Sequence, residues 1–267
     1  MNQPQQMSKT VAICGGSWFS ADLDLPGQSF GEIMCAKNNW QLYSLARGGC
    51  SNFAIALQVD KAIDLNVDVV VIGATTPDRC EFPIINDQNI SIWDQLKKSF
   101  NFLSWFSLQP DVYVKERGIS NILHHMSLSS TYPWISNPTI VSESLNNLMW
   151  YNRTKGNKLT AEQLDALRMY MLNLYDSGIK RQMDCWIISD ACRRLEFAGI
   201  PYLIFPEELY QNYFEKDISW IPEKNVIHDF SVQKLPVGGT AQFHYDIING
   251  TNIMFANYVE LKIKDLI

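Results

Sequence analysis

The sequence predicts an α/β protein built on a parallel sheet. Three stretches carry this prediction: 11–14, 40–45 and 68–73 are patterned as strands, and each runs into a turn, with helix-patterned sequence further on. The run 68–73 is rich in β-branched residues and closed by glycine, which is typical of a strand buried on both faces. Strands that alternate with helices are joined by right-handed crossovers, so we expect the three turns to lie along one edge of the sheet.

The composition is that of a soluble globular protein. The 267 residues are 46% hydrophobic and 19% charged, and the length suits one domain with an elaboration. The net charge of −6, from 22 basic and 28 acidic residues without a basic cluster, argues against nucleic acid or an anionic membrane as a partner. The first nine residues are polar, and no stretch approaches about 18 apolar residues, so we expect a cytoplasmic protein without a signal peptide or membrane span. The six cysteines lack Cys-x-x-Cys spacing, which favours buried thiols over disulfides or zinc ligands.

The first strand is the element on which the functional argument depends. The apolar run 11–14 leads into Gly15 and Gly16, and Ser17 follows at the strand's carboxyl end. Open α/β sheets bind their ligands at this edge, so the Ser17 hydroxyl is a candidate nucleophile. On these residues alone, the alternative is a simple turn with a helix cap.

The remaining elements follow from apolar spacing and from their boundaries. Apolar residues at helical spacing predict helices near 30–36 and from 52 or 53 to about 65. The region 84–159 loosens into an aromatic insertion, partly helical around 92–105. Beyond it we expect two helices, at about 160–175 and 179–197, and then a strand bounded by prolines at 201–206. A short strand at about 225–230 and a final helix at about 247–261 complete the chain.

Four blocks in this order resemble the SGNH, or GDSL-like, hydrolases, a family of serine esterases and acyltransferases. They are 15–17, 49–52 and 73–76, each placed after a predicted strand, and His244 before the final helix. The blocks are spread over nearly the whole chain. The resemblance implies one SGNH-like domain over 1–267, with a three-layer, flavodoxin-like parallel sheet and the large insertion, and it implies no cofactor.

The resemblance also assigns roles to individual residues. Ser17 matches the family's nucleophilic serine, His244 matches its catalytic histidine, and the N–H of Gly49 matches an oxyanion-hole donor. In the implied reaction, Ser17 attacks an ester carbonyl while His244 accepts its proton, and N–H groups hold the tetrahedral oxyanion. Water then releases the acid with the help of the same histidine.

Three positions depart from the family's pattern. Gly16 replaces the aspartate of the Gly-Asp-Ser block, Thr75 replaces an oxyanion-hole asparagine, and Ala241 stands where an aspartate usually precedes the histidine. The Thr75 hydroxyl, the Asn52 amide or the Arg79 guanidinium could donate to the oxyanion instead.

The orientation of the catalytic histidine therefore has two explanations. Either Ser17 and His244 act as a dyad in which a backbone carbonyl orients the imidazole, or Asp246 or Asp229 supplies the acid. His228 is the reserve candidate for the base.

The other polar motifs carry weaker functional interpretations. The adjacent His124 and His125 lack an Asp, Glu or His at ligand spacing, so we expect packing or a surface patch there and not a metal site. Trp18 and Arg79 are candidate substrate contacts, although Arg79 next to Asp78 favours a local ion pair. No phosphate-binding glycine motif is present, which argues against a nucleotide.

Taken together, the sequence predicts a serine esterase or deacylase for a small-molecule ester, for example of an acylated carbohydrate. An acyltransferase differs only in the acceptor, and the sequence does not separate the two. The three departures from the family's pattern motivate an alternative from a different class, a non-catalytic structural or glycan-binding protein on the same fold. The sequence does not indicate an oligomeric state.

Overall fold

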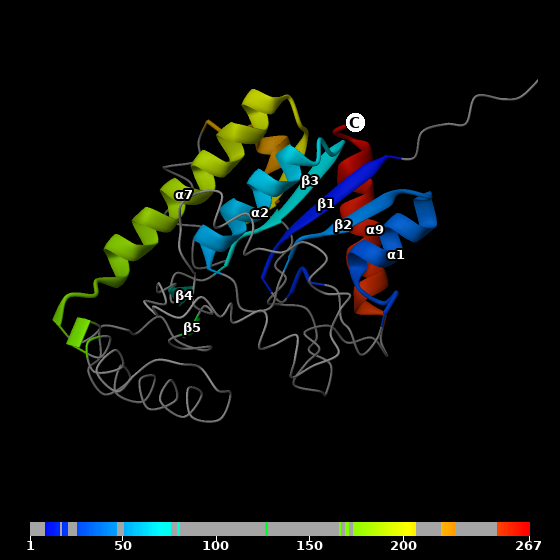
Figure 1. The fold of residues 1–267 in the computed structure, drawn as a ribbon. Coiled ribbons are helices and arrows are strands. Elements are labelled where there is room, and N and C mark those ends of the chain that lie inside the picture. The colour runs from blue at the N-terminus through cyan, green and yellow to red at the C-terminus, as the bar shows by residue number, and fades with distance from the viewer. Residues whose placement is uncertain are drawn as a thin grey trace, which may run out of the picture. The chain divides into compact units, whose positions relative to one another are not determined.

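The computed structural model describes the sheet, its helices and a few further segments (Figure 1). The described residues are 9–16, 18–20, 26–46, 51–75, 79–80, 126–127, 166, 169–170, 173–206, 220–227 and 250–267, with 79–80 and 126–127 described as backbone only. The chain divides into two compact units, one formed by 1–76 with 182–267 and the other by 77–181. The predicted insertion at about 84–159 falls within the second unit and, except for 126–127, lies outside the described residues.

Four parallel strands form the sheet of the first unit. They are β1 (Thr10–Gly15), β2 (Gln41–Ser44), β3 (Val69–Gly73) and β6 (Tyr202–Phe205), in the order β2-β1-β3-β6. In the register, β1 and β3 end level with each other, because Gly15 pairs with Gly73. The predicted parallel α/β sheet is confirmed, and β1, β2 and β3 all end at its carboxyl edge.

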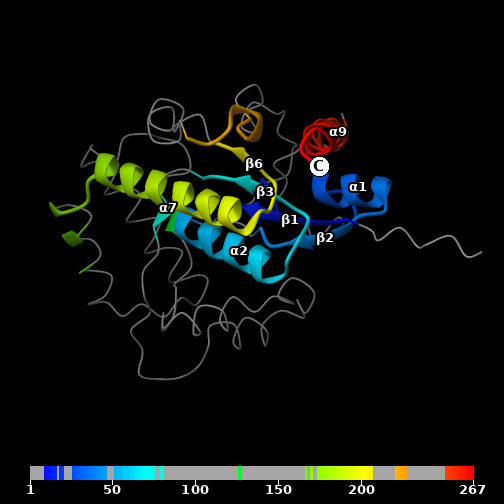
Figure 2. The ribbon, with the colours of Figure 1, turned by 90° about the horizontal axis from the view of Figure 1, so that it is seen from above.

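Helices cover both faces of this sheet (Figure 2). On one face lie α2 (Asn52–Asp64) and α7 (Ser177–Ala198), and on the other lie α1 (Phe30–Asn38) and α9 (Thr251–Lys264). Each of these helices overlaps a stretch for which the apolar spacing predicts a helix, although α9 begins and ends about three residues later than expected. Its N-cap is Gly250, whose φ of 70° is in the left-handed region that glycine adopts at little cost.

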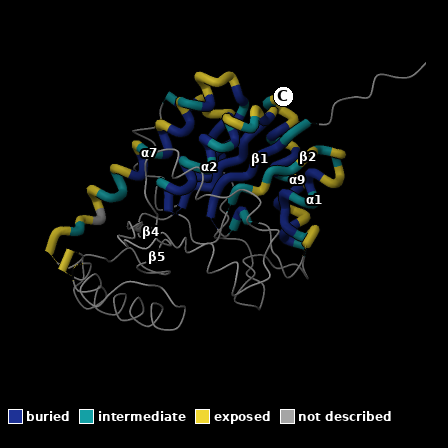
Figure 3. Tube along the Cα trace, in the orientation of Figure 1, coloured by how far each residue is buried: buried dark blue, intermediate teal, exposed yellow. Residues whose placement is uncertain are grey.

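The alternation of side chains along β1 divides the core into two clusters. Ala12 and Cys14 pack with α2 and α7, whereas Val11 and Ile13 pack with α1 and α9. All four are at most 1% exposed, so β1 is buried on both faces, as the apolar run predicts (Figure 3).

The smaller elements differ from the expectations in detail. The start of the predicted strand at 225–230 overlaps a 3-10 helix, η2 (Glu223–Asn225). Directly after it, Val226 forms a single parallel bridge to Ile204 of β6. In the second unit, β4 (Arg79–Cys80) pairs antiparallel with β5 (Met126–Ser127), a pairing that the sequence analysis did not predict. The helices expected near 92–105 and 160–175 lie wholly or largely outside the described residues.

The described thiols behave as the cysteine spacing predicts. Cys14, Cys35, Cys185 and Cys192 are buried thiols. Burial raises the pKa of Cys35 to about 12 and raises that of Cys192 as well, so both stay protonated at neutral pH. Within the described part of the chain, no helix is long and apolar enough to cross a membrane.

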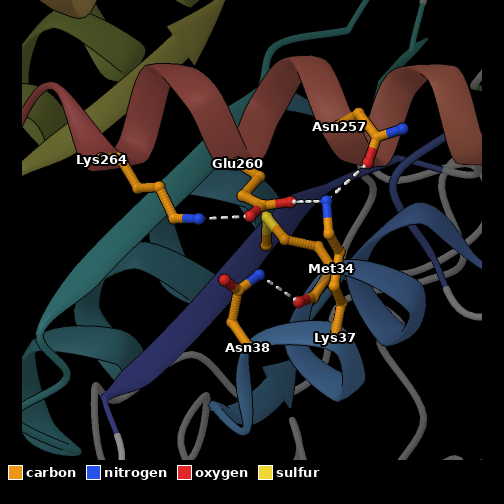
Figure 4. Close-up of polar contacts among 6 residues, drawn as sticks. All are labelled: Met34, Lys37, Asn38, Asn257, Glu260 and Lys264. Carbon is orange, nitrogen blue, oxygen red and sulfur yellow. Dashed lines mark hydrogen bonds and ion pairs between the residues drawn. The ribbon is translucent and has the colours of Figure 1, made fainter.

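A buried carboxylate joins the two helices of one face (Figure 4). Glu260 of α9 is 5% exposed and forms ion pairs with Lys37 of α1, at 2.7 Å, and with Lys264 one turn further along α9. Burial alone would raise the pKa of Glu260, but hydrogen bonds from Lys264, Lys37 and Asn38 outweigh it and lower this pKa to about 2. Glu260 is therefore ionised throughout the physiological range.

Candidate functional site

The candidate site is the carboxyl edge of the sheet, where β1 and β3 end side by side. After β1 the chain passes to β2 on one side, and after β2 it returns to β3 on the other, so this is the point where the strand order reverses. In open α/β sheets such a switch point forms the crevice in which ligands bind. In the sequence, Ser17 follows the last residue of β1 by two positions.

The turn after β1 is tight. The N–H of Phe19 donates to the carbonyl of Gly16 at 3.0 Å, so the chain reverses direction between these two residues. Ser17 itself lies outside the described residues.

Phe19 places an aromatic ring across the ends of both central strands. A Cβ atom on Gly15 would lie 2.8 Å from the Phe19 Cβ, and one on Gly73 would lie 2.1 Å from the Phe19 ring. Phe19 is 5% exposed, and its ring packs edge-on against those of Phe30 and Phe255 at centroid distances of 5.6 and 6.0 Å. Glycine is therefore required at both strand ends to admit the ring that supports the turn.

The loop after β3 is held by a side chain of α2. The Oδ1 of Asn52 accepts a hydrogen bond from the N–H of Thr75, and its Nδ2 donates to the carbonyl of the same residue, each at 2.9 Å. The Nδ2 also donates to the carboxylate of Asp184 on α7 at 3.2 Å. Asn52, Thr75 and Asp184 are each at most 2% exposed, so this polar network is buried at the edge of the sheet.

The start of α2 explains why Asn52 reaches this position. Ser51 is the N-cap, and its hydroxyl accepts hydrogen bonds from the N–H groups of Phe53 and Ala54 at 3.1 and 3.4 Å. The cap fixes the beginning of α2 at the carboxyl edge, and Asn52 becomes its first residue. Its short amide can then reach the backbone of the neighbouring β3 loop.

The structure brings together two of the seven predicted site residues, Asn52 and Thr75. Ser17, Gly49 and His244 lie outside the described residues, so the predicted nucleophile, base and backbone donor stay predictions. Trp18 is half-buried and packs against the aromatic cluster around Phe19, which gives it a packing role beside the expected substrate contact. The backbone of Arg79 lies in β4 of the second unit, and its side chain is outside the described atoms.

The bonds of Asn52 bear directly on the expected oxyanion hole. Both hydrogens of its Nδ2 group donate within the fold, one to Thr75 and one to Asp184. To donate to an oxyanion, Asn52 would have to give up one of these buried bonds, at a cost of about 1–3 kcal/mol.

Two polar residues of the edge escaped the sequence analysis. Asp184 on α7 contacts Asn52, and Gln58 on α2 bonds the backbone of Gly15. The available signal was weak: each is a single polar residue directly before an apolar residue that faces the core, Cys185 or Val59.

Comparisons of the chain with models of known families, with curated proteins and with solved structures find no match. Within the described residues, no group of three His, Cys, Asp or Glu could hold a metal ion. The chemistry of the site must therefore be inferred from the residues of this chain alone.

Proposed function

We propose that this protein is a serine esterase or deacylase of the SGNH type, with Ser17 as the nucleophile and His244 as the general base. The observation that carries the proposal is the position of the Gly15–Gly16–Ser17 sequence. What supports it is that β1, which this sequence closes and follows, ends at the switch point of a parallel sheet, level with the end of β3. A serine hydroxyl at such an edge is accessible to a ligand bound in the crevice.

The strand order supports the flavodoxin-like architecture that the SGNH resemblance implies. Taken in chain order, the four strands are arranged as second, first, third and fourth, and Val226 extends the sheet beside β6 through its bridge to Ile204. This is the order of the flavodoxin-like doubly wound sheet, which binds its ligand between the first and third strands. Ser17 follows the first of these strands and Thr75 follows the third.

The proposed reaction proceeds through an acyl-enzyme. The Oγ of Ser17 attacks the ester carbonyl carbon while His244 takes the hydroxyl proton, and the N–H groups of Ser17 and Gly49 hold the oxyanion. Collapse of the tetrahedral intermediate breaks the ester C–O bond, and His244 returns the proton to the departing alcohol. Water, deprotonated by the same histidine, then attacks the acyl group and releases the acid from Ser17.

A non-catalytic protein on the same fold is the second candidate. The observation that favours it is the use of Asn52, whose amide is engaged in holding Thr75 and Asp184 and is not directed to a substrate. Loss of one oxyanion donor lowers kcat by about a hundredfold to a thousandfold in serine hydrolases, so a protein of this kind could retain the fold and a binding site while losing the reaction.

Turnover of a short-chain nitrophenyl ester distinguishes the two. We expect the wild type to hydrolyse it and Ser17→Ala to lower kcat by at least about a thousandfold. His244→Ala should lose activity similarly, whereas His228→Ala and Ser44→Ala, the latter an exposed serine of β2, should retain it. If the wild type hydrolyses no ester and a serine-directed phosphonate does not label Ser17, the esterase proposal is wrong and the non-catalytic one is favoured.

A further inference from the structure

Within the described residues, the last residue of β1 has no strand beside it on one side. Successive residues of a strand direct their backbone N–H and C=O groups alternately to its two neighbours. Ile13 directs its carbonyl to the β2 side, where it accepts hydrogen bonds from Leu45 and Ala46 at 2.9 and 2.8 Å. Gly15, two residues later, faces the same side, but β2 has already ended at Ser44.

A side chain of α2 takes the place of the missing strand. The Oε1 of Gln58 accepts a hydrogen bond from the N–H of Gly15 at 2.7 Å, and its Nε2 makes a longer contact of 3.5 Å with the carbonyl of Gly15. The amide group of Gln58 thus presents the donor and acceptor that a neighbouring backbone would present. Without it, a buried N–H at the end of β1 would lose its partner.

At the end of β3, a side chain of α2 again takes the place of a neighbouring strand. The N–H of Ala74 donates to Phe205 of β6 at 3.1 Å, so Thr75 faces the opposite side, towards β1. Because β1 has turned away after Gly15, Asn52 supplies both hydrogen bonds to Thr75. Two amide side chains from one helix therefore replace strand pairing at the two strand ends that bound the switch point.

We propose that Gln58 is a positioning residue for the Ser17 nucleophile. The proposal rests on the proposed esterase function and deepens it. Gln58 bonds the backbone of Gly15, which lies level with Gly73 of β3, and the carbonyl of Gly16 accepts the hydrogen bond from Phe19 that closes the turn after β1. Fixing the peptide before Gly15 fixes the direction in which the turn leaves the sheet, and thereby the direction of the serine hydroxyl towards its base and the ester.

The test compares two replacements of Gln58 with a replacement of an exposed glutamine. Gln58→Met keeps the length and helix propensity of the side chain and removes both hydrogen bonds. Gln58→Glu keeps an acceptor for the Gly15 N–H but loses the donor to its carbonyl. Gln41→Met in β2 is the control, because Gln41 is exposed and its amide contacts only the hydroxyl of Tyr43 among the bonds described for it.

The decisive readout is kcat per folded protein on the nitrophenyl ester, with the folded fraction measured by circular dichroism. We expect Gln58→Met to lower kcat by about 10- to 100-fold with KM within twofold of the wild type, because misplacing a reacting group slows the chemical step. Gln58→Glu should lower kcat by a smaller factor, and the kcat of Gln41→Met should equal that of the wild type. A kcat within twofold of the wild type in Gln58→Met, at full folding, would overturn the proposal.

Hydrogen exchange separates this proposal from the esterase proposal. We expect the Gly15 amide to exchange at least about tenfold faster in Gln58→Met than in the wild type, which corresponds to the loss of about 1.4 kcal/mol of protection. If the wild type is inactive but this acceleration is seen, the esterase proposal is wrong, while Gln58 is still shown to fix the backbone at the start of the turn. Unchanged exchange in Gln58→Met contradicts the positioning role whatever the activity.

Discussion

At the two edges of the sheet, the backbone groups of the strand ends find hydrogen-bond partners of different kinds. At the carboxyl edge, the neutral amides of Asn52 and Gln58 bond the ends of β3 and β1. At the amino edge, the exposed carboxylate of Asp68 accepts hydrogen bonds from the backbone N–H and hydroxyl of Thr10 at 2.6 and 2.7 Å. Those bonds, the side-chain one first, lower the pKa of Asp68, so this edge uses an ionised group where the other uses neutral ones.

The buried acids near each edge differ in the same way. Glu260 ties α9 to Lys37, close to the amino end of β2, and its lysine partners are about half exposed. Asp184 near the carboxyl edge accepts a hydrogen bond from Asn52 and is 1% exposed. The amino edge is thus fixed by charged groups with solvent-exposed partners, whereas the edge that holds the candidate site is fixed by two amide side chains and one buried acid.

Phe19→Ala should have the largest effect on the carboxyl edge, because it removes the ring that covers Gly15 and Gly73. We expect a loss of about 3–5 kcal/mol in the free energy of unfolding, measured by urea denaturation. Phe197→Ala is the matched control, since Phe197 is 98% exposed on α7, and it should change stability by less than about 0.5 kcal/mol. Equal losses in the two variants would show that the packing of Phe19 does not support this edge.

Asn52→Leu tests the hydrogen bonds of the same edge. The change leaves the N–H and carbonyl of Thr75 and the Asp184 carboxylate without this partner, in a site that is almost fully buried. We expect a loss of about 2–4 kcal/mol by the same measurement. Asn257→Leu replaces an exposed asparagine of α9 that accepts a solvent-exposed hydrogen bond from Lys37 at 3.0 Å, and it should lie within about 0.5 kcal/mol of the wild type. A loss below about 1 kcal/mol for Asn52→Leu would argue that water takes over its bonds and that the network is not tightly held.

Glu260→Gln tests the charged character of the amino edge. The pKa of Glu260 is about 2 in the folded state, against about 4.3 in an unfolded chain, so its ionised form favours folding above about pH 4.3. This corresponds to at most about 3 kcal/mol, which solvent around the half-exposed lysines reduces to about 1–2 kcal/mol.

The pH dependence follows from the sign of that shift. The stability contributed by Glu260 should be fully present at pH 6 and should disappear as the pH falls from about 4.3 to 2. In urea denaturation at pH 6, Glu260→Gln should therefore be less stable than the wild type, and the difference should shrink at pH 3. Glu223→Gln, at an exposed position, is the control and should show no such convergence. A difference independent of pH would indicate that packing, and not charge, explains the effect.

The main elements of the fold were predictable because they follow from periodicity. The β-branched run of β3 and the apolar spacing of α2 fix these elements to within about one residue. The tight turn after β1 was also predictable, since Gly15 and Gly16 follow a buried strand directly. These signals are local, and each depends on residues within a single element.

The polar contacts of the edge were not predictable because they join residues far apart in the chain. A glutamine in the middle of a helix, such as Gln58, usually faces solvent, and only the early end of β2 gives it a backbone partner at Gly15. Asn52 was singled out as an oxyanion donor, yet the course of β3 makes the backbone of Thr75 its nearest partner. Similarly, glutamate usually lies at the surface, yet Glu260 is buried, and one of its two lysine partners, Lys37, comes from α1, far away in the chain.

The distance between Ser17 and His244 tests the central claim most directly. A crystal structure of the protein after reaction with a serine-directed phosphonate would measure it together with the site of attachment. We predict phosphorus bonded to the Oγ of Ser17 and the Nε2 of His244 about 3 Å from that oxygen. An unmodified Ser17 more than about 8 Å from His244, with no loop able to close the gap, would contradict the account.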